Sequence, residues 1–75
     1  MKIAIIGLGG VGGYLSAMIT KNTAHHVVGF ARGMHLKKIQ KDGIQIQEDE
    51  NSFTVVLDAK ELKDASGYFD VVFFC

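Results

Sequence analysis

The chain has 75 residues, enough for one small domain at most. Its hydrophobic fraction of 48% and charged fraction of 21% are typical of globular proteins and exclude a disordered chain. Basic and acidic residues number 8 each, so the net charge is zero and gives no support for a nucleic-acid or membrane-surface partner, since both favour basic surfaces.

The first half of the chain predicts two strands joined by a helix. The isoleucine-rich run from Lys2 to Ile6 is typical of a strand buried on both faces, and Gly7 ends it. The run from His26 to Phe30 favours a second strand because it contains adjacent valines. Between them a helix is predicted from about Gly10 to about Lys21, on apolar residues at helical spacing: Val11, Leu15, Met18 and Ile19.

A short helix and a hairpin follow. The helix is predicted from Met34 to about Lys41, with Leu36 and Ile39 facing inward and Gly43 as its terminator. Alternating apolar residues then predict two half-exposed strands on either side of a solvated acidic turn at 48–51. The apolar positions are Ile44 and Ile46 in the first strand and Phe53, Val55 and Leu57 in the second.

The last part of the chain predicts one or two helical turns over Lys60 to Ala65 and a strand from Val71 to Cys75, opened by Asp70. We expect Cys75 to be buried, as free cysteines usually are. The chain stops on this apolar run without a cap, which indicates a piece of a longer protein. A single cysteine excludes an internal disulfide, and without a signal-like or membrane-spanning segment we expect a cytoplasmic protein.

Strands that alternate with helices indicate crossover units on a parallel sheet. We therefore predict an α/β fold: a Rossmann-type parallel sheet flanked by helices, with a β-hairpin insertion. Residues 1–75 are expected to be the N-terminal part of a dinucleotide-binding domain.

The loop Gly7-Leu8-Gly9-Gly10-Val11-Gly12 lies between a predicted strand and a predicted helix, the context in which its glycine spacing indicates a dinucleotide site. Gly7 permits the tight turn, Gly9 lets a pyrophosphate approach the backbone, and Gly12 lets the helix pack close to the strand. The alternative is a glycine-rich turn without a ligand. That alternative does not explain glycines inside the helix, which cost about 1 kcal/mol each.

Arg32 indicates NADP as the cofactor. An NAD site places an acidic residue about 20 residues after the loop, where it bonds the ribose 2′-hydroxyl. Here Arg32 stands 20 residues after Gly12 and no carboxylate is near it in sequence. A guanidinium can form paired charge-assisted bonds to a 2′-phosphate. The alternative is an ordinary surface arginine.

Four other residues give weaker signals. His35 and Lys37 could assist Arg32 at the 2′-phosphate, although a solvated helix face is the simpler interpretation. His25 and His26 are adjacent in a loop without ligand-spaced partners, so no metal site is predicted. No nucleophile–base pair is found, so no catalytic residue is assigned.

The segment from Met1 to Tyr14 resembles the start of ketopantoate reductases (2-dehydropantoate 2-reductases). Ala31-Arg32-Gly33, followed by His35-Leu36, Ile39 and Asp42-Gly43-Ile44, is similar to the next part of that family. There a short helix and a hairpin follow the arginine, and an Asp-initiated strand like Asp70 to Phe74 comes next. The resemblance spans the whole chain, and the Ala-Arg-Gly segment with the hairpin is its more specific part.

The resemblance implies NADPH-dependent reduction of a small 2-keto acid, 2-dehydropantoate, to pantoate on the route to pantothenate and coenzyme A. It also implies a helical substrate domain beyond Cys75 that carries the catalytic lysine and acidic residue, so the 75 residues alone should be inactive. A homo-oligomer is compatible with this resemblance. Two rival functions stay open: a nucleotide-sensing Rossmann module without catalysis, and another NADP-dependent hydroxyacid dehydrogenase.

Overall fold

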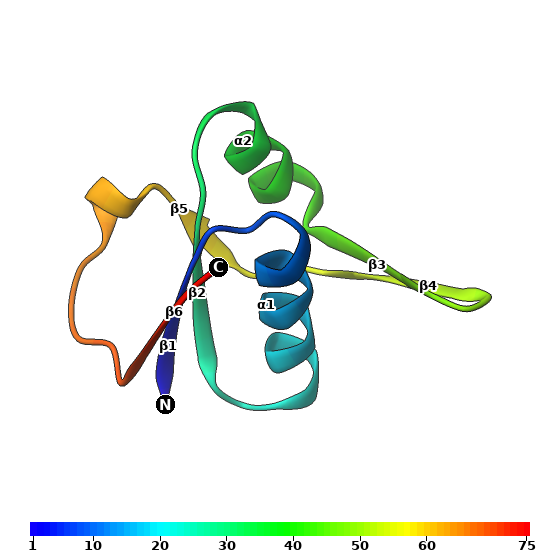
Figure 1. Ribbon diagram of the computed structural model, residues 1–75, viewed down its shortest axis with the longest axis horizontal. Coiled ribbons are helices and arrows are strands. Elements are labelled where there is room, and N and C mark those ends of the chain that lie inside the picture. Colours follow the sequence, from blue (N-terminus) through cyan, green and yellow to red (C-terminus); the bar gives the residue numbers. More distant parts are fainter.

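The computed structural model describes residues 1–75 and contains a four-stranded sheet and a two-stranded hairpin (Figure 1). The larger sheet has the order β5-β2-β1-β6, and all its neighbouring strands are parallel. Its strands are β1 (Lys2–Ile6), β2 (His26–Phe30), β5 (Asp58–Lys60) and β6 (Val71–Phe74). The order reverses beside the central strand β1, as in a Rossmann-type sheet. The predicted fold class is confirmed.

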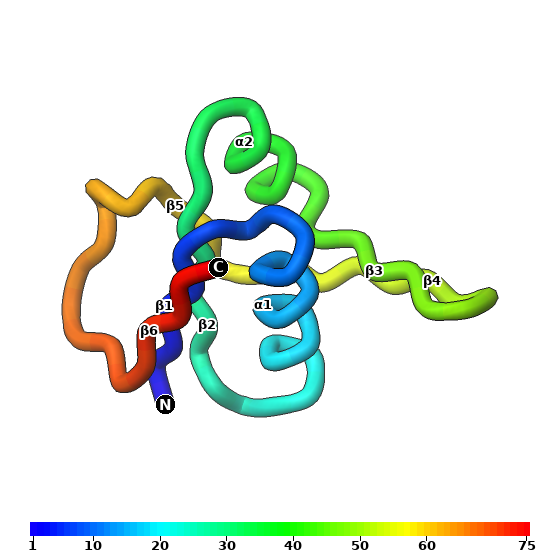
Figure 2. The backbone as a smooth tube through the Cα atoms, in the orientation of Figure 1, coloured from blue at the N-terminus to red at the C-terminus, as the bar shows by residue number.

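Two helices and the hairpin connect these strands. Helix α1 (Gly10–Asn22) joins β1 to β2, and helix α2 (Gly33–Asp42) follows β2. The hairpin of β3 (Ile44–Glu48) and β4 (Asn51–Val55) extends away from the sheet (Figure 2), and its residues Ile46 and Val55 pack against Ala17 of α1. Gly43 ends α2 with a φ of +77°, a conformation that favours glycine, so the predicted terminator is confirmed.

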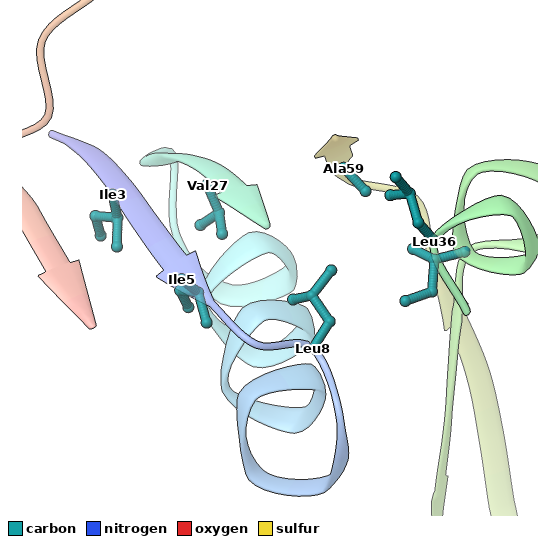
Figure 3. Close-up of a cluster of buried hydrophobic side chains, with 7 residues drawn as sticks. Ile3, Ile5, Leu8, Val27, Leu36 and Ala59 are labelled. Carbon is teal, nitrogen blue, oxygen red and sulfur yellow. The ribbon is translucent and has the colours of Figure 1, made fainter. Parts of the chain in front are cut away.

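The main core lies between one face of the sheet and the two helices (Figure 3). Apolar side chains from β1, β2, β5 and α2 form it, together with one loop residue. They are Ile3, Ile5, Leu8, Val27, Leu36, Ile39 and Ala59. The predicted inward positions of α2, Leu36 and Ile39, are therefore confirmed.

Helix α1 approaches the sheet through its smallest residues. The buried positions of the helix are Gly12, Gly13, Ser16 and Ala17. Val11, counted in the sequence among the apolar positions of the helix, is 77% exposed. The small residues face β1 because α1 starts so close to that strand that a larger side chain would collide: a Cβ at Gly12 would overlap the carbonyl oxygen of Gly7.

Strand β5 was not predicted. The sequence placed Lys60 in a helical segment and Leu57 in the hairpin, whereas Lys60 ends β5, β4 stops at Val55, and only a 3₁₀ turn, η1 (Leu62–Asp64), forms. Asp and Lys are poor strand formers, so the local sequence carries little signal. Pairing with β2 and burial of Ala59 stabilise this strand, and both are long-range effects.

Strand β6 is at the sheet edge, with β1 on one side only. Phe74 is 81% exposed, and Cys75 is exposed as well, which corrects the expectation that Cys75 is buried. The strand extends from Val71 to Phe74, and Cys75 continues its pairing by donating its backbone N–H to the Ile6 carbonyl at 2.9 Å. Strand β6 therefore pairs in parallel with β1. A parallel strand is buried only when it also has a second neighbouring strand and a covered face, and β6 has one neighbour.

Candidate functional site

The three loops that follow β1, β2 and β5 meet at one edge of the sheet, because parallel strands all end on the same side. Backbone hydrogen bonds join the loops there. The Gly7 N–H donates to the Phe30 carbonyl at 3.0 Å, and the Ala31 N–H donates to the Lys60 carbonyl at 3.2 Å. In open α/β sheets this carboxyl edge, next to the reversal of strand order, is where ligands bind.

A cavity of about 450 Å³ opens at this edge. Residues from all three loops and the strand ends line it: Ile6, Gly7, Phe30, Ala31, Arg32, Glu61, Leu62 and Lys63. The cavity brings together Gly7 and Arg32, which the sequence analysis selected for separate reasons. Arg32 is exposed and forms no salt bridge with any carboxylate of the chain, so its guanidinium is available to a ligand.

Gly7 and Gly12 are required by the fold itself. Gly7 has a φ of +100°, and a Cβ there would lie 2.5 Å from the carbonyl oxygen of Cys75. A Cβ at Gly12 would overlap the Gly7 carbonyl oxygen and come within 3.0 Å of the Cys75 Cβ. These two glycines allow the loop to turn tightly and α1 to begin against β1, the roles expected from the sequence.

Gly9 differs from its neighbours because nothing in the chain demands a glycine there. Its backbone is extended, with φ of −78° and ψ of 161°, and an added Cβ would find no atom within 4 Å. The space in front of Gly9 is therefore open solvent. An absent side chain at this position matters only to something that approaches from outside the chain.

The N-terminus of α1 is open to an anion. The first backbone N–H groups of a helix have no partner within it, and here no side chain caps them and no acidic residue stands in the first turn. Gly9, Gly10 and Val11 are all exposed. The helix dipole adds roughly half a positive charge at this end. The loop therefore has the geometry and the electrostatics of a phosphate site.

Leu8, which the sequence analysis included among the loop residues of the site, anchors the loop in the core. Its side chain is 4% exposed and points away from the open side of the loop, toward α2 (Figure 3). A Cβ on Gly29 of β2 would lie 2.7 Å from the Leu8 side chain, so the absence of that Cβ makes room for the leucine. Leu8 can offer a ligand its backbone only.

Sequence reasoning missed the residues that β5 delivers to the cavity. Glu61, Leu62 and Lys63 line it from the far side of β2, and Lys63 Nζ lies 3.5 Å from Glu61 Oε2. Because helical turns were predicted over Lys60 to Ala65, strand β5 was missed, and so was the delivery of the residues after it to the carboxyl edge of the sheet. A carboxylate is therefore present near Arg32, although it comes from another strand.

The histidines lie in three different surroundings. His25 Nδ1 is 2.9 Å from the N-terminal amine and His26 Nε2 is 3.3 Å from Asp58 Oδ2, both at the opposite edge of the sheet. His35 Nε2 contacts the Leu8 carbonyl oxygen at 3.2 Å. The chain contains no group of three or more side chains that could hold a metal ion, and no helix is long and apolar enough to cross a membrane.

Three comparisons with known proteins point to the same family. The family model described as ketopantoate reductase PanE/ApbA matches residues 3–75. A curated 2-dehydropantoate 2-reductase from Mesorhizobium japonicum is 43% identical over 49 residues, which are 65% of this chain and 15% of that protein. The crystal structure of a "putative ketopantoate reductase" from Ralstonia solanacearum MolK2 matches with a TM-score of 0.83 and 35% identity, over 96% of this chain and 22% of that one. The chain thus spans less than a quarter of either relative.

Proposed function

This chain belongs to the ketopantoate reductase family, and on that premise we propose that it is the cofactor-binding part of an enzyme that reduces 2-dehydropantoate to pantoate with NADPH in the cytoplasm. The observation that carries the proposal is the shared position of the glycine loop and Arg32. Both stand at the carboxyl edge of the sheet, and Gly7 and Arg32 line the same cavity.

The glycine loop is proposed to bind the pyrophosphate of the cofactor. The uncapped N–H groups of α1 supply hydrogen-bond donors, and the open space in front of Gly9 permits close approach to the backbone. Hydrogen bonds to a charged group contribute about 1.5–3 kcal/mol each. Leu8 contributes by fixing the loop against the core.

Arg32 is proposed to bind the 2′-phosphate and so to select NADP over NAD. Its side chain stands at the start of α2, beside the cavity, with no competing ion pair. Glu61 opposes this preference because a carboxylate repels the phosphate and can accept from a ribose 2′-hydroxyl instead. Lys63 offsets it by pairing with Glu61. The three charges leave the cavity one net positive charge, which favours the phosphate.

NADPH, when bound, supplies the hydride for reduction of the 2-keto carbon. The residues described here bind and orient the cofactor and do not themselves provide an acid or a base. The resemblance implies that the catalytic lysine and acidic residue of the family, and the substrate-binding helical domain, lie in a later part of the polypeptide. The resemblance to this family is also the reason for proposing a small 2-keto acid as the substrate.

The test is an assay of the intact protein that carries these residues. We expect 2-dehydropantoate-dependent oxidation of NADPH, with little oxidation of NADH at equal concentration. Other 2-keto acids in the same assay define the substrate range. Turnover of another 2-keto acid in place of 2-dehydropantoate would assign a different NADP-dependent dehydrogenase. Binding of NADPH without turnover of any keto acid would instead support a nucleotide-sensing module.

A further inference from the structure

We propose that His35 is a positioning residue, which holds the glycine loop in its phosphate-binding shape through the Leu8 carbonyl. This inference rests on the proposed function, because it concerns the same cofactor site. The sequence left His35 as either a solvated residue or a helper at the 2′-phosphate. The structure places its ring on the loop instead.

The contact is a hydrogen bond from the ring to the backbone. His35 Nε2 lies 3.2 Å from the Leu8 carbonyl oxygen. A carbonyl oxygen can only accept, so Nε2 carries the proton and donates it. The acceptor belongs to the residue whose side chain anchors the loop in the core. Leu8 is thereby held twice, by burial of its side chain and by the bond to its carbonyl.

Holding the Leu8 carbonyl also orients the next backbone donor. The peptide bond between Leu8 and Gly9 is trans, so its C=O and N–H point in opposite directions. With the carbonyl directed at His35, the Gly9 N–H is directed away from α2. The Leu8 carbonyl also lies close to α1: a Cβ on Gly13 would be 2.8 Å from the Leu8 carbonyl oxygen, so the glycine leaves the room that this carbonyl orientation needs.

His35 connects the two halves of the proposed cofactor site. It lies in the first turn of α2, the helix that Arg32 caps, and it reaches across to the loop after β1. It does not line the cavity of Arg32; it lines a second cavity of about 500 Å³ between α2 and the hairpin. Because Nε2 is engaged with Leu8 and His35 does not line the Arg32 cavity, the geometry argues against direct contact with the 2′-phosphate.

The two roles predict different binding patterns. NADPH and NADH share the pyrophosphate but differ in the 2′-phosphate. If His35 acts through the loop, removal of its donor weakens both cofactors by the same factor. If His35 acts at the 2′-phosphate or through Arg32, only NADPH weakens. The ratio of the two dissociation constants therefore separates the roles.

The experiment measures NADPH and NADH dissociation constants by fluorescence titration of the intact protein and of three variants. His35→Leu removes the donor, and we expect both constants to rise by about 2- to 12-fold with their ratio unchanged. His35→Gln keeps an N–H donor and should restore most of the affinity. Lys38→Gln, which changes another α2 residue of the same second cavity, is the matched control and should leave both constants unchanged.

Several outcomes would overturn the inference. Unchanged constants in folded His35→Leu, weakening of NADPH alone, or an equal effect in Lys38→Gln would each do so while leaving the proposed function intact. If His35→Leu fails to fold, His35→Gln decides, because wild-type affinity supports the donor role and full loss contradicts it. A wild-type protein that binds neither dinucleotide would refute the proposed function and this inference together.

Discussion

The glycine loop and the segment Ala31-Arg32-Gly33 follow neighbouring parallel strands and end at the same edge of the sheet, yet the fold constrains them very differently. The loop is packed against backbone: Gly7 and Gly12 have no room for a Cβ. The arginine segment is open, since Arg32 is exposed and a Cβ on Gly33 would meet nothing within 4 Å. Residues of the first kind are needed for the fold itself, whereas nothing in the fold requires the Arg32 side chain.

This contrast implies that substitutions in the two regions should separate stability from affinity. Within the loop itself, Gly9 resembles the arginine segment more than it resembles Gly12, because its surroundings are empty. The same substitution at Gly9 and Gly12 is therefore a direct test of the distinction.

The largest effect is expected for Gly12→Val. Its Cβ would overlap the backbone oxygen of Gly7, which cannot move without disrupting the turn after β1. We expect a loss of about 3 kcal/mol or more of unfolding free energy, the upper end for overpacked sites. Urea denaturation of the intact protein measures it, with Gly9→Val as the matched control. Equal stability of the two variants would remove the distinction between these glycines.

The next largest effect is expected for Gly9→Val, on binding instead of stability. The valine would occupy the space through which the pyrophosphate must approach, so more than one charge-assisted bond is lost. NADPH affinity should fall by about 100-fold or more, measured by calorimetric titration, while the unfolding midpoint stays near wild type. If this variant keeps wild-type affinity, the pyrophosphate does not bind at the loop.

Arg32→Asp should change the cofactor preference without affecting the fold. Loss of the guanidinium bonds should reduce NADPH affinity by about 10- to 150-fold, and the new carboxylate should improve NADH binding by accepting from the ribose 2′-hydroxyl. Arg32→Lys keeps the charge but loses the paired geometry, so it should lie between wild type and Arg32→Asp. Equal affinity of the wild type for both cofactors would refute the assignment of Arg32.

The smallest effect is expected at the rim of the cavity. Lys63→Gln leaves Glu61 without its partner, and Glu61→Gln removes the opposing charge. Because exposed ion pairs contribute up to about 1 kcal/mol, NADPH affinity should fall by up to about 5-fold in the first variant and rise by a similar factor in the second. Titrations at low and high salt measure this, since screening should reduce both changes. Shifts of the same sign would contradict a charge effect.

Much of the fold was accessible from the sequence because its signals are local. The strands β1 and β2 are marked by apolar β-branched runs, the end of α2 by Gly43, and the reversal after β1 by glycines. Each of these depends on residues close together in the chain. The loop and Arg32 could be selected for the same reason, as glycine spacing and the missing acidic residue are visible without a structure.

The sequence by itself determined three strands of the parallel sheet, β1, β2 and β6, where the chain must turn, and which loop carries the glycines. Only the tertiary structure decided how those segments are used. It exposes β6 and Cys75, forms β5 from poor strand residues, and brings Glu61 and Lys63 to the cavity of Arg32. It also brings the His35 ring to the Leu8 carbonyl, 27 residues away in the sequence. The reason is physical: burial and site membership depend on neighbours that are distant in sequence, and local residue patterns do not encode them.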